Sequence, residues 1–158
     1  MISFDTSCAG AQRSSVAYTQ DTPDIVASIS SSEAFSREIS EQPQWVRQAC
    51  KNVAKLQELP PNWDSYGGEP ANVSSLLVAI DLLRFLGAIA GMPEPRVGLT
   101  PDGTVGLSWD WNNGLRSLQV EVLPDKSFAY ALVAEDDESA EREDETTDPS
   151  TIATLIGR

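Results

Sequence analysis

The chain has 158 residues, a formal net charge of −13, two cysteines and no histidine. Its length suits one domain with a hydrophobic core. The lack of histidine removes the commonest general base, the commonest transition-metal ligand and the usual partner of a nucleophilic serine or cysteine. The negative charge disfavours direct nucleic-acid binding, because phosphate backbones repel it. We therefore expect no metal, no cofactor and no nucleic-acid partner.

About half of the negative charge lies at the C-terminal end. Residues 135–158 carry nine acids and two arginines, a net charge of −7, and the other 134 residues carry −6. Such a run is typical of a solvated tail. The polar residues 1–29 hold no helical or strand period, which predicts a disordered arm. The expected organisation is an arm at 1–29, a single domain at 30–134 and a disordered acidic tail at 135–158.

Two helices are predicted before any strand. Apolar residues from Trp45 to Leu59 recur at steps of three and four, which indicates an amphipathic helix that Pro60-Pro61 ends. Asn72 is a suitable N-cap for a second helix over about 73–90. The apolar residues of this second helix cover more than one stripe, which places it at the domain centre or against a partner.

The second helix does not predict a membrane span, because Asp81 and Arg84 interrupt it. A third, shorter helix over about 31–39 is suggested by Ser30 and Glu33, which have capping-box spacing. The first residues of the chain lack a basic, then apolar, secretory pattern, so the default expectation is a cytoplasmic protein.

After the second helix the apolar period changes from 3.6 to 2 residues, which indicates strands. Turn signals at Pro101-Asp102-Gly103, Asn112-Asn113-Gly114 and Pro124-Asp125 separate four such segments. The fold class is therefore α+β, with two or three N-terminal helices packed on one face of a four-stranded antiparallel meander. The inward positions expected on the strands are Val97, Leu99, Val105, Leu107, Trp109, Trp111, Leu118, Val120, Val122, Phe128, Tyr130 and Leu132.

The loop between the two predicted helices has the most unusual composition in the chain. In one interpretation Trp63 fills the seam between helices and sheet, Asn62 or Asp64 bonds backbone amides, and Gly67 and Gly68 supply positive φ. In the other, Asp64 and Tyr66 line a recognition or catalytic pocket, which requires a concave site and a raised Asp64 pKa.

Two tryptophans on one predicted strand allow two interpretations as well. Trp109 and Trp111 share a strand face, which favours a place in the core. If that face were open, the two indoles would form a platform for a partner.

The run Leu59-Pro60-Pro61-Asn62-Trp63-Asp64-Ser65-Tyr66-Gly67, followed by a helix and by Pro101-Asp102-Gly103 with its strand, resembles a set of uncharacterised small bacterial proteins. An Asn-Trp-Asp-x-Tyr-Gly signature marks that set. The resemblance covers about residues 45–133. It implies a bacterial or phage-type origin and a helix-then-sheet layout, and it supplies no activity and no catalytic residue.

The leading hypothesis is a non-enzymatic protein that binds another protein, as antitoxins, immunity proteins and inhibitors do. A basic partner would suit the acidic chain. Its candidate binding residues are Trp63, Asp64, Tyr66, Gly67, Trp109 and Trp111. The alternatives are a small-molecule-binding or carboxylate-based catalytic site at Asp64 and Tyr66, and an accessory subunit of a larger assembly.

Overall fold

Three α-helices and five strands make up residues 42–135 and 137–157, the part of the chain that the computed structural model describes. The predicted arm over 1–29 and the short helix over 31–39 lie outside these residues. The elements run in the order α2 (Gln44–Leu56), α3 (Val73–Gly87), β1 (Arg96–Leu99), β2 (Val105–Trp111), η1 (Asn112–Gly114), β3 (Arg116–Val122), β4 (Phe128–Ala134), η2 (Glu138–Ala140), β5 (Arg142–Thr146) and α4 (Pro149–Ile156).

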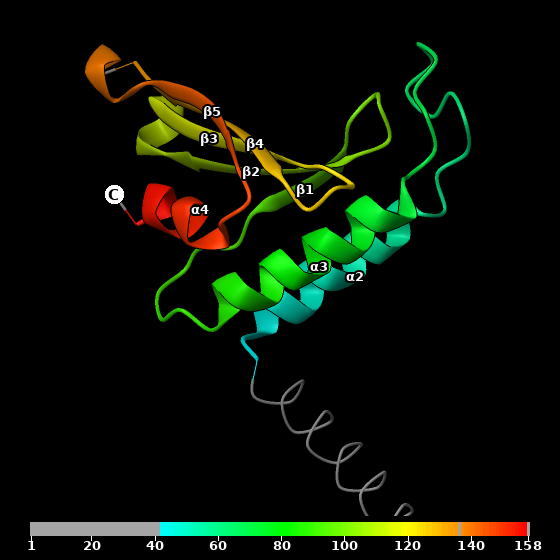
Figure 1. The fold of residues 1–158 in the computed structure, drawn as a ribbon, viewed down its shortest axis with the longest axis horizontal. Helices are drawn as coiled ribbons and strands as arrows, with labels where there is room; N and C mark the ends of the chain where they lie inside the picture. The colour runs from blue at the N-terminus through cyan, green and yellow to red at the C-terminus, as the bar shows by residue number, and fades with distance from the viewer. Residues whose placement is uncertain (1–41, 136, 158) are drawn as a thin grey trace, which may run out of the picture. The chain divides into compact units, whose positions relative to one another are not determined.

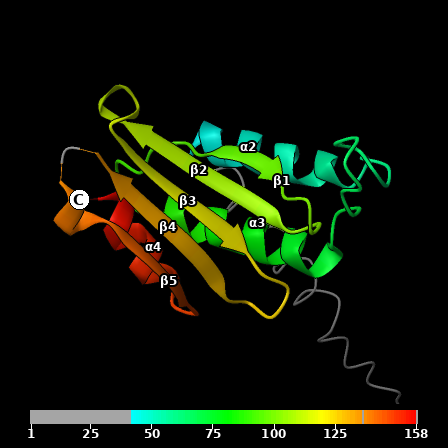
Figure 2. The ribbon, with the colours of Figure 1, turned by 90° about the horizontal axis from the view of Figure 1, so that it is seen from above.

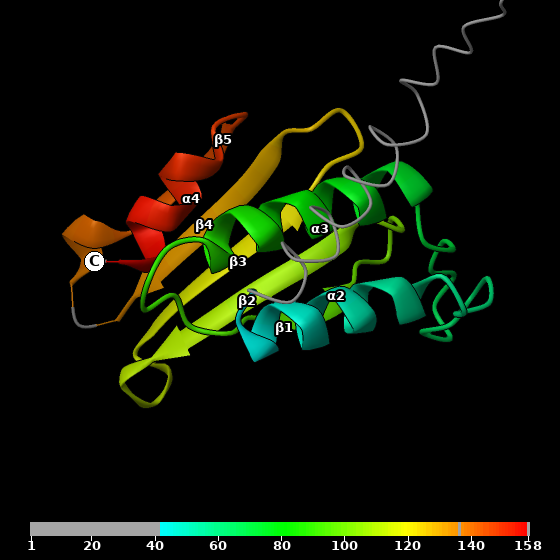
Figure 3. The ribbon, with the colours of Figure 1, turned by 90° about the horizontal axis from the view of Figure 1, so that it is seen from below.

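The strands form one antiparallel sheet in the order β1-β2-β3-β4-β5, so each strand pairs with its neighbour in sequence. Helices α2, α3 and α4 lie together on one side of this sheet (Figure 1), and they cross it side by side when it is seen from below (Figure 3). The predicted α+β class is confirmed. None of the described helices is long and apolar enough to cross a lipid bilayer.

The core lies between the helices and the sheet. Alternate residues of β2, β3 and β4 point into it, as the period of two predicts. Helix α3 lies centrally and buries six residues of its 15, while α2 packs beside it. The buried apolar side chains include Val53, Leu83, Leu86, Leu107, Leu118, Val120, Leu132 and Ile152.

Helix α3 is bonded to the sheet at its first turn. Asn72 caps the helix by accepting from the amides of Ser74 and Ser75. The buried Ser75 hydroxyl then donates to the Val122 carbonyl oxygen (2.5 Å) and accepts from the Val105 amide (2.8 Å). This hydroxyl fixes the helix against β2 and β3, at positions where the strand ladder leaves these groups available.

The predicted number of four strands is wrong, because part of the acidic segment is a fifth strand. Residues Arg142–Thr146 pair with β4, with Tyr130 opposite Asp144 and Leu132 opposite Arg142. The composition of this segment is unusual for a strand, and its sequence has no apolar alternation that would predict one. Contacts with other elements of the fold, and not the residues of the strand itself, stabilise this pairing.

Helix α4 provides these contacts. The expectation of a disordered tail over 135–158 is therefore wrong. Asp148 accepts from the Ser150 amide and Pro149 occupies the first turn, so the helix has a good start. Ile152, Leu155 and Ile156 are buried in the core shared with α3 and the sheet. Burying each such side chain contributes on the order of 2 kcal/mol, which holds β5 on the sheet edge.

Candidate functional site

The loop predicted to carry function is a closed structure held by its own side chains. The Asn62 amide donates to the Gly68 carbonyl oxygen (2.7 Å), and the Asn62 side chain accepts from the Gly67 amide (2.6 Å). The Asp64 carboxylate accepts from the amides of Tyr66 (2.9 Å) and Gly68 (2.8 Å). Both polar side chains therefore satisfy the loop backbone, as the structural interpretation proposed.

Glycine is required at two positions of this loop. Gly67 has a φ of +97°, a backbone conformation that residues with a side chain rarely adopt. Gly68 does not have a positive φ, so that part of the expectation is wrong. A Cβ on Gly68 would lie 2.8 Å from the Trp63 Nε1 and 2.9 Å from the Asp64 Oδ1. The indole of Trp63 is thus half-buried against its own loop, with a buried and unpaired Nε1. Trp63 does not belong to the described core, which corrects the expectation that it fills the seam between helices and sheet.

The loop is joined to the sheet by backbone bonds just after it. The Glu69 amide donates to the Pro101 carbonyl oxygen (2.8 Å), and the Asn72 amide donates to the Gly103 carbonyl oxygen (2.7 Å). These bonds tie the start of α3 to the β1–β2 turn. The connection between helices and sheet therefore passes through this backbone, and not through the indole.

Asp64 and Tyr66 do not form the pocket that a catalytic interpretation requires. The hydrogen bonds from the Tyr66 and Gly68 amides lower the pKa of Asp64 below its ordinary value, whereas that interpretation needs a raised one. The Tyr66 side chain is 94% exposed and points away from the body. The geometry thus gives Asp64 a structural role, and leaves Tyr66 free at the surface.

The two strand tryptophans face the helix side of the sheet. Trp109 is buried in the core, and its Nε1 donates to the Pro93 carbonyl oxygen (3.0 Å). Trp111 is half-buried against the core, next to Leu155 and Ile156 of α4. The core interpretation is confirmed for Trp109, and the open platform of two indoles is wrong.

The other face of the sheet is free of the described helices (Figure 2). Because residues directly opposite in the ladder point the same way, the register identifies its side chains. We call this surface the open face. It consists of Arg96, Gly98, Gly106, Ser108, Asp110, Ser117, Gln119, Glu121, Ala129, Ala131, Val133, Glu143 and Glu145.

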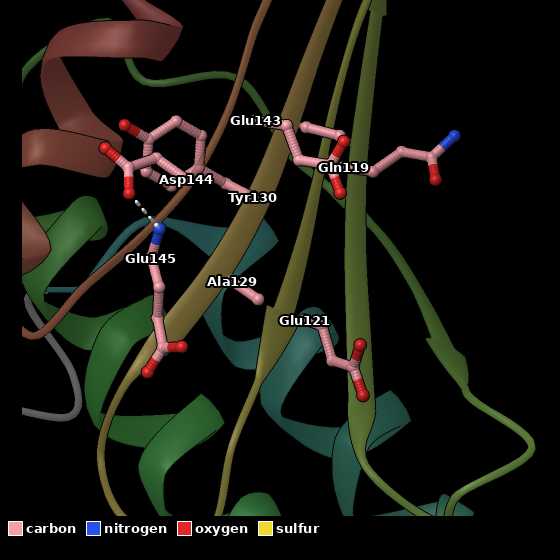
Figure 4. A pocket seen from close by; sticks show the side chains of 8 residues that line it. Gln119, Glu121, Ala129, Tyr130, Glu143, Asp144 and Glu145 are labelled. Atoms are coloured by element: carbon pink, nitrogen blue, oxygen red, sulfur yellow. Dashed lines mark hydrogen bonds between the residues drawn. The ribbon is translucent and has the colours of Figure 1, made fainter.

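Small residues hollow the open face on either side of a ridge on β3. Gln119 and Glu121 form the ridge. The hollow over β4, which we call the β4 trough, has a volume of about 610 Å³, and Ala129 and Ala131 form its floor. Its further lining residues are Gln119, Glu121, Tyr130, Glu143, Asp144 and Glu145 (Figure 4). A second hollow of about 400 Å³ lies over β1 and β2, where a Cβ on Gly98 would meet open space.

Carboxylates border the β4 trough on both sides. Glu121 stands on the β3 ridge, and Glu143 and Glu145 stand on the edge strand β5. In Figure 4 Tyr130 and Asp144 point to the opposite side of these strands from Glu121. The trough is therefore an aliphatic floor between two acidic walls.

Three of the charged side chains on the open face are held by neighbours. Glu121 accepts from the Thr104 hydroxyl, which is itself hydrogen-bonded to the Thr100 hydroxyl (2.6 Å). Arg96 pairs with Asp110 at 2.9 Å on the β1 side. Among the described residues, the face is thus polarised, with the cation Arg96 at β1 and the carboxylates Glu121, Glu143 and Glu145 from β3 to β5.

The carboxylates of this face do not converge on one point. Within the described ranges, no group of three or more Asp, Glu, Cys or His side chains is placed to hold a metal ion. The walls of the trough are instead spread along two strands, which suits contact with an extended partner surface.

No protein-family model, curated protein or solved structure matches the chain. The resemblance carried by the Asn-Trp-Asp-x-Tyr-Gly signature stays a prediction.

Sequence reasoning predicted helices on one face of the sheet but missed the acidic wall of the other face, because that wall lies in the segment expected to be a tail. Glu143 and Glu145 reach the sheet only because β5 pairs with β4. A usable signal was present: Asp148-Pro149-Ser150 is a helix start, and Ile152, Leu155 and Ile156 follow at helical spacing. A helix that buries these residues must bring the preceding acidic segment back to the body.

Proposed function

We propose that this protein acts by binding another protein, and that the open face is its contact surface for a basic partner. The observation that carries the proposal is the hollowed sheet face, which none of the described helices covers and which has acidic walls at Glu121, Glu143 and Glu145. An antiparallel sheet can leave one face to solvent, and that face is then accessible to a partner. Charge complementarity would steer a basic partner to this face and select against acidic ones.

The loop and the tryptophans have a supporting part in this proposal. Trp109 belongs to the core, and Asp64 satisfies amides of its own loop. Tyr66 is an exposed aromatic side chain on that closed loop and is available as a peripheral contact. Binding of the kind that antitoxins, immunity proteins or inhibitors perform requires no catalytic group, which agrees with the absence of histidine from the sequence.

Affinity capture from native lysate with matched variants tests the proposal. The face variant Glu121→Gln/Glu143→Gln/Glu145→Gln removes three carboxylates from the open face. The control Glu58→Gln/Glu69→Gln/Asp81→Asn removes three exposed carboxylates elsewhere. We expect wild type and control to capture the same protein, the face variant to lose it, and added salt to weaken capture. Equal capture by the face variant would contradict the proposal.

Exposed apolar residues on α3 favour a second candidate, an accessory subunit of a larger assembly. Val73 and Leu77 are 60% and 59% exposed on the helix side of the molecule. Under this candidate, light scattering finds a stable oligomer that Leu77→Ser dissociates. A wild-type protein that is a monomer, with the same mass as the Leu77→Ser variant, would contradict this candidate.

A further inference from the structure

The width of the β4 trough is close to the diameter of an α-helix. Its walls on β3 and β5 are two strand spacings apart, roughly 10 Å, which is close to the diameter of an α-helix. Its floor of Ala129 and Ala131 keeps the backbone of β4 accessible at close range. A helix placed along β4 would repeat on this face the helix-on-sheet packing already present on the other.

The spacing of the carboxylates along β5 fits cations on one flank of such a helix. Glu143 and Glu145 are two residues apart on a strand, which places them about 7 Å apart on the same face. Residues i and i+4 of a helix rise about 6 Å along its axis and share a face. Lysines or arginines at i and i+4 can therefore meet Glu143 and Glu145 together.

The opposite wall of the trough has a fixed position. Glu121 lies in the same ladder row as Ala129 and Glu145, and the Thr104 hydroxyl holds its carboxylate. Because Thr104 directly precedes β2, this bond draws the Glu121 carboxylate to the β2 side of β3, away from the alanine floor. Aliphatic stems of lysine or arginine suit this floor, since they pack on apolar surface while the charge stays near water.

Resting on the proposed function, we infer that the partner docks through a basic amphipathic α-helix that lies along β4. Its underside carries small or apolar residues over Ala129 and Ala131. One flank carries two cations at i and i+4 for Glu143 and Glu145.

Two stapled helical peptides of identical composition test this inference. Both are held helical by a staple on the solvent side and carry an alanine-rich underside. The matched peptide has lysines at i and i+4 on one flank. The scrambled peptide moves the second lysine to i+2, on the other side of the helix. Equal charge and helicity leave the cation spacing as the difference.

Titration of the full chain with each peptide gives the readout. We expect the matched peptide to bind about two- to threefold more tightly, the contribution of one modest ion pair, because the scrambled peptide keeps the first lysine. We also expect Glu143→Gln/Glu145→Gln to abolish that difference, and Glu58→Gln/Glu69→Gln to preserve it. The matched peptide should shift backbone NMR resonances of β4 and β5.

Equal affinities for the two peptides, or a preference that survives Glu143→Gln/Glu145→Gln, would overturn the inferred helix. Failure here is distinguishable from failure of the proposed function. If the peptides are not discriminated while the face variant still loses its captured protein, the open face binds a partner of another shape. If capture is also unchanged, the surface itself is wrong.

Discussion

Single residues join the layers of this domain, and Ser75 is the clearest example. Its hydroxyl is buried between α3 and the sheet, where it both donates to Val122 and accepts from Val105. A serine near a helix start is ordinarily interpreted as part of a cap, so the sequence alone does not reveal this second role. The neighbouring Ser74, by contrast, is exposed.

Ser75→Ala should lower the free energy of unfolding by about 1–3 kcal/mol, because it leaves buried backbone groups of Val105 and Val122 without their partner. Ser74→Ala is the matched control and should change it by less than about 0.5 kcal/mol. Urea unfolding of both variants measures the difference. Equal stability of the two would show that the Ser75 bonds contribute nothing.

Asp64 predicts a pH dependence of loop stability. Its folded pKa is lowered by the Tyr66 and Gly68 amides, so its contribution is complete above the ordinary carboxyl pKa of about 4. That contribution is lost as the pH falls through the lower folded pKa. Asp64→Ala should therefore be less stable than wild type at pH 7, with a gap that narrows below pH ~4.

Asp64→Asn separates the charge from the hydrogen bonds, because its side-chain oxygen can still accept from both amides. Thermal melts from pH 7 to pH 2.5 follow all three proteins. Asp64→Asn should lie between the other two at pH 7. A gap between wild type and Asp64→Ala that widens in acid would contradict the assigned pKa direction.

Among the elements, those with a local apolar period were predictable. Helices α2 and α3 and the strands β1 to β4 follow periods of 3.6 and 2, and Asn112-Asn113-Gly114 forms the predicted hairpin with positive φ at all three residues. Strand β5 was not predictable from its own residues. It is made of charged side chains and a threonine, and it forms because of β4 beside it and α4 after it.

The parts of the candidate site likewise differ in how far the sequence predicts them. The closed loop and the buried Trp109 could be argued from residue types, because turns and cores use local rules. The open face could not, since its two walls come from β3 and β5, which are adjacent to β4 only through strand pairing. Nor could the seam role of Trp63 be tested without coordinates, and it proved wrong.

Ile152 tests the dependence of β5 on α4. It is fully buried, and Ile152→Ala should lower the free energy of unfolding by about 2–5 kcal/mol through lost burial and a cavity. Thr154→Ala, at an exposed position of the same helix, should have a small effect. Hydrogen exchange should also show faster exchange of the β5 amides in Ile152→Ala. An unchanged free energy of unfolding in Ile152→Ala would contradict the packing of α4 and support the expectation of a disordered tail.

At the scale of the whole molecule, the fold determines where part of the negative charge lies. Part of the charge that the sequence assigns to a tail is placed on the edge of the sheet by β5. There Glu143 and Glu145 join Glu121 around the β4 trough, while the nearest cation of the open face, Arg96, pairs with Asp110. Part of the acidity thus lies on the open face, opposite the described helices, and these carboxylates make that face suited to a basic protein.

Site-specific photo-crosslinking tests the central claim, that the open face contacts the partner, most directly. A photoreactive residue replaces either Gln119, on the ridge of the open face, or Leu77, exposed on α3 on the other side of the sheet. After irradiation in native lysate, we predict that position 119 yields a crosslinked protein and position 77 does not. Crosslinks from position 77 with none from position 119 would contradict the account.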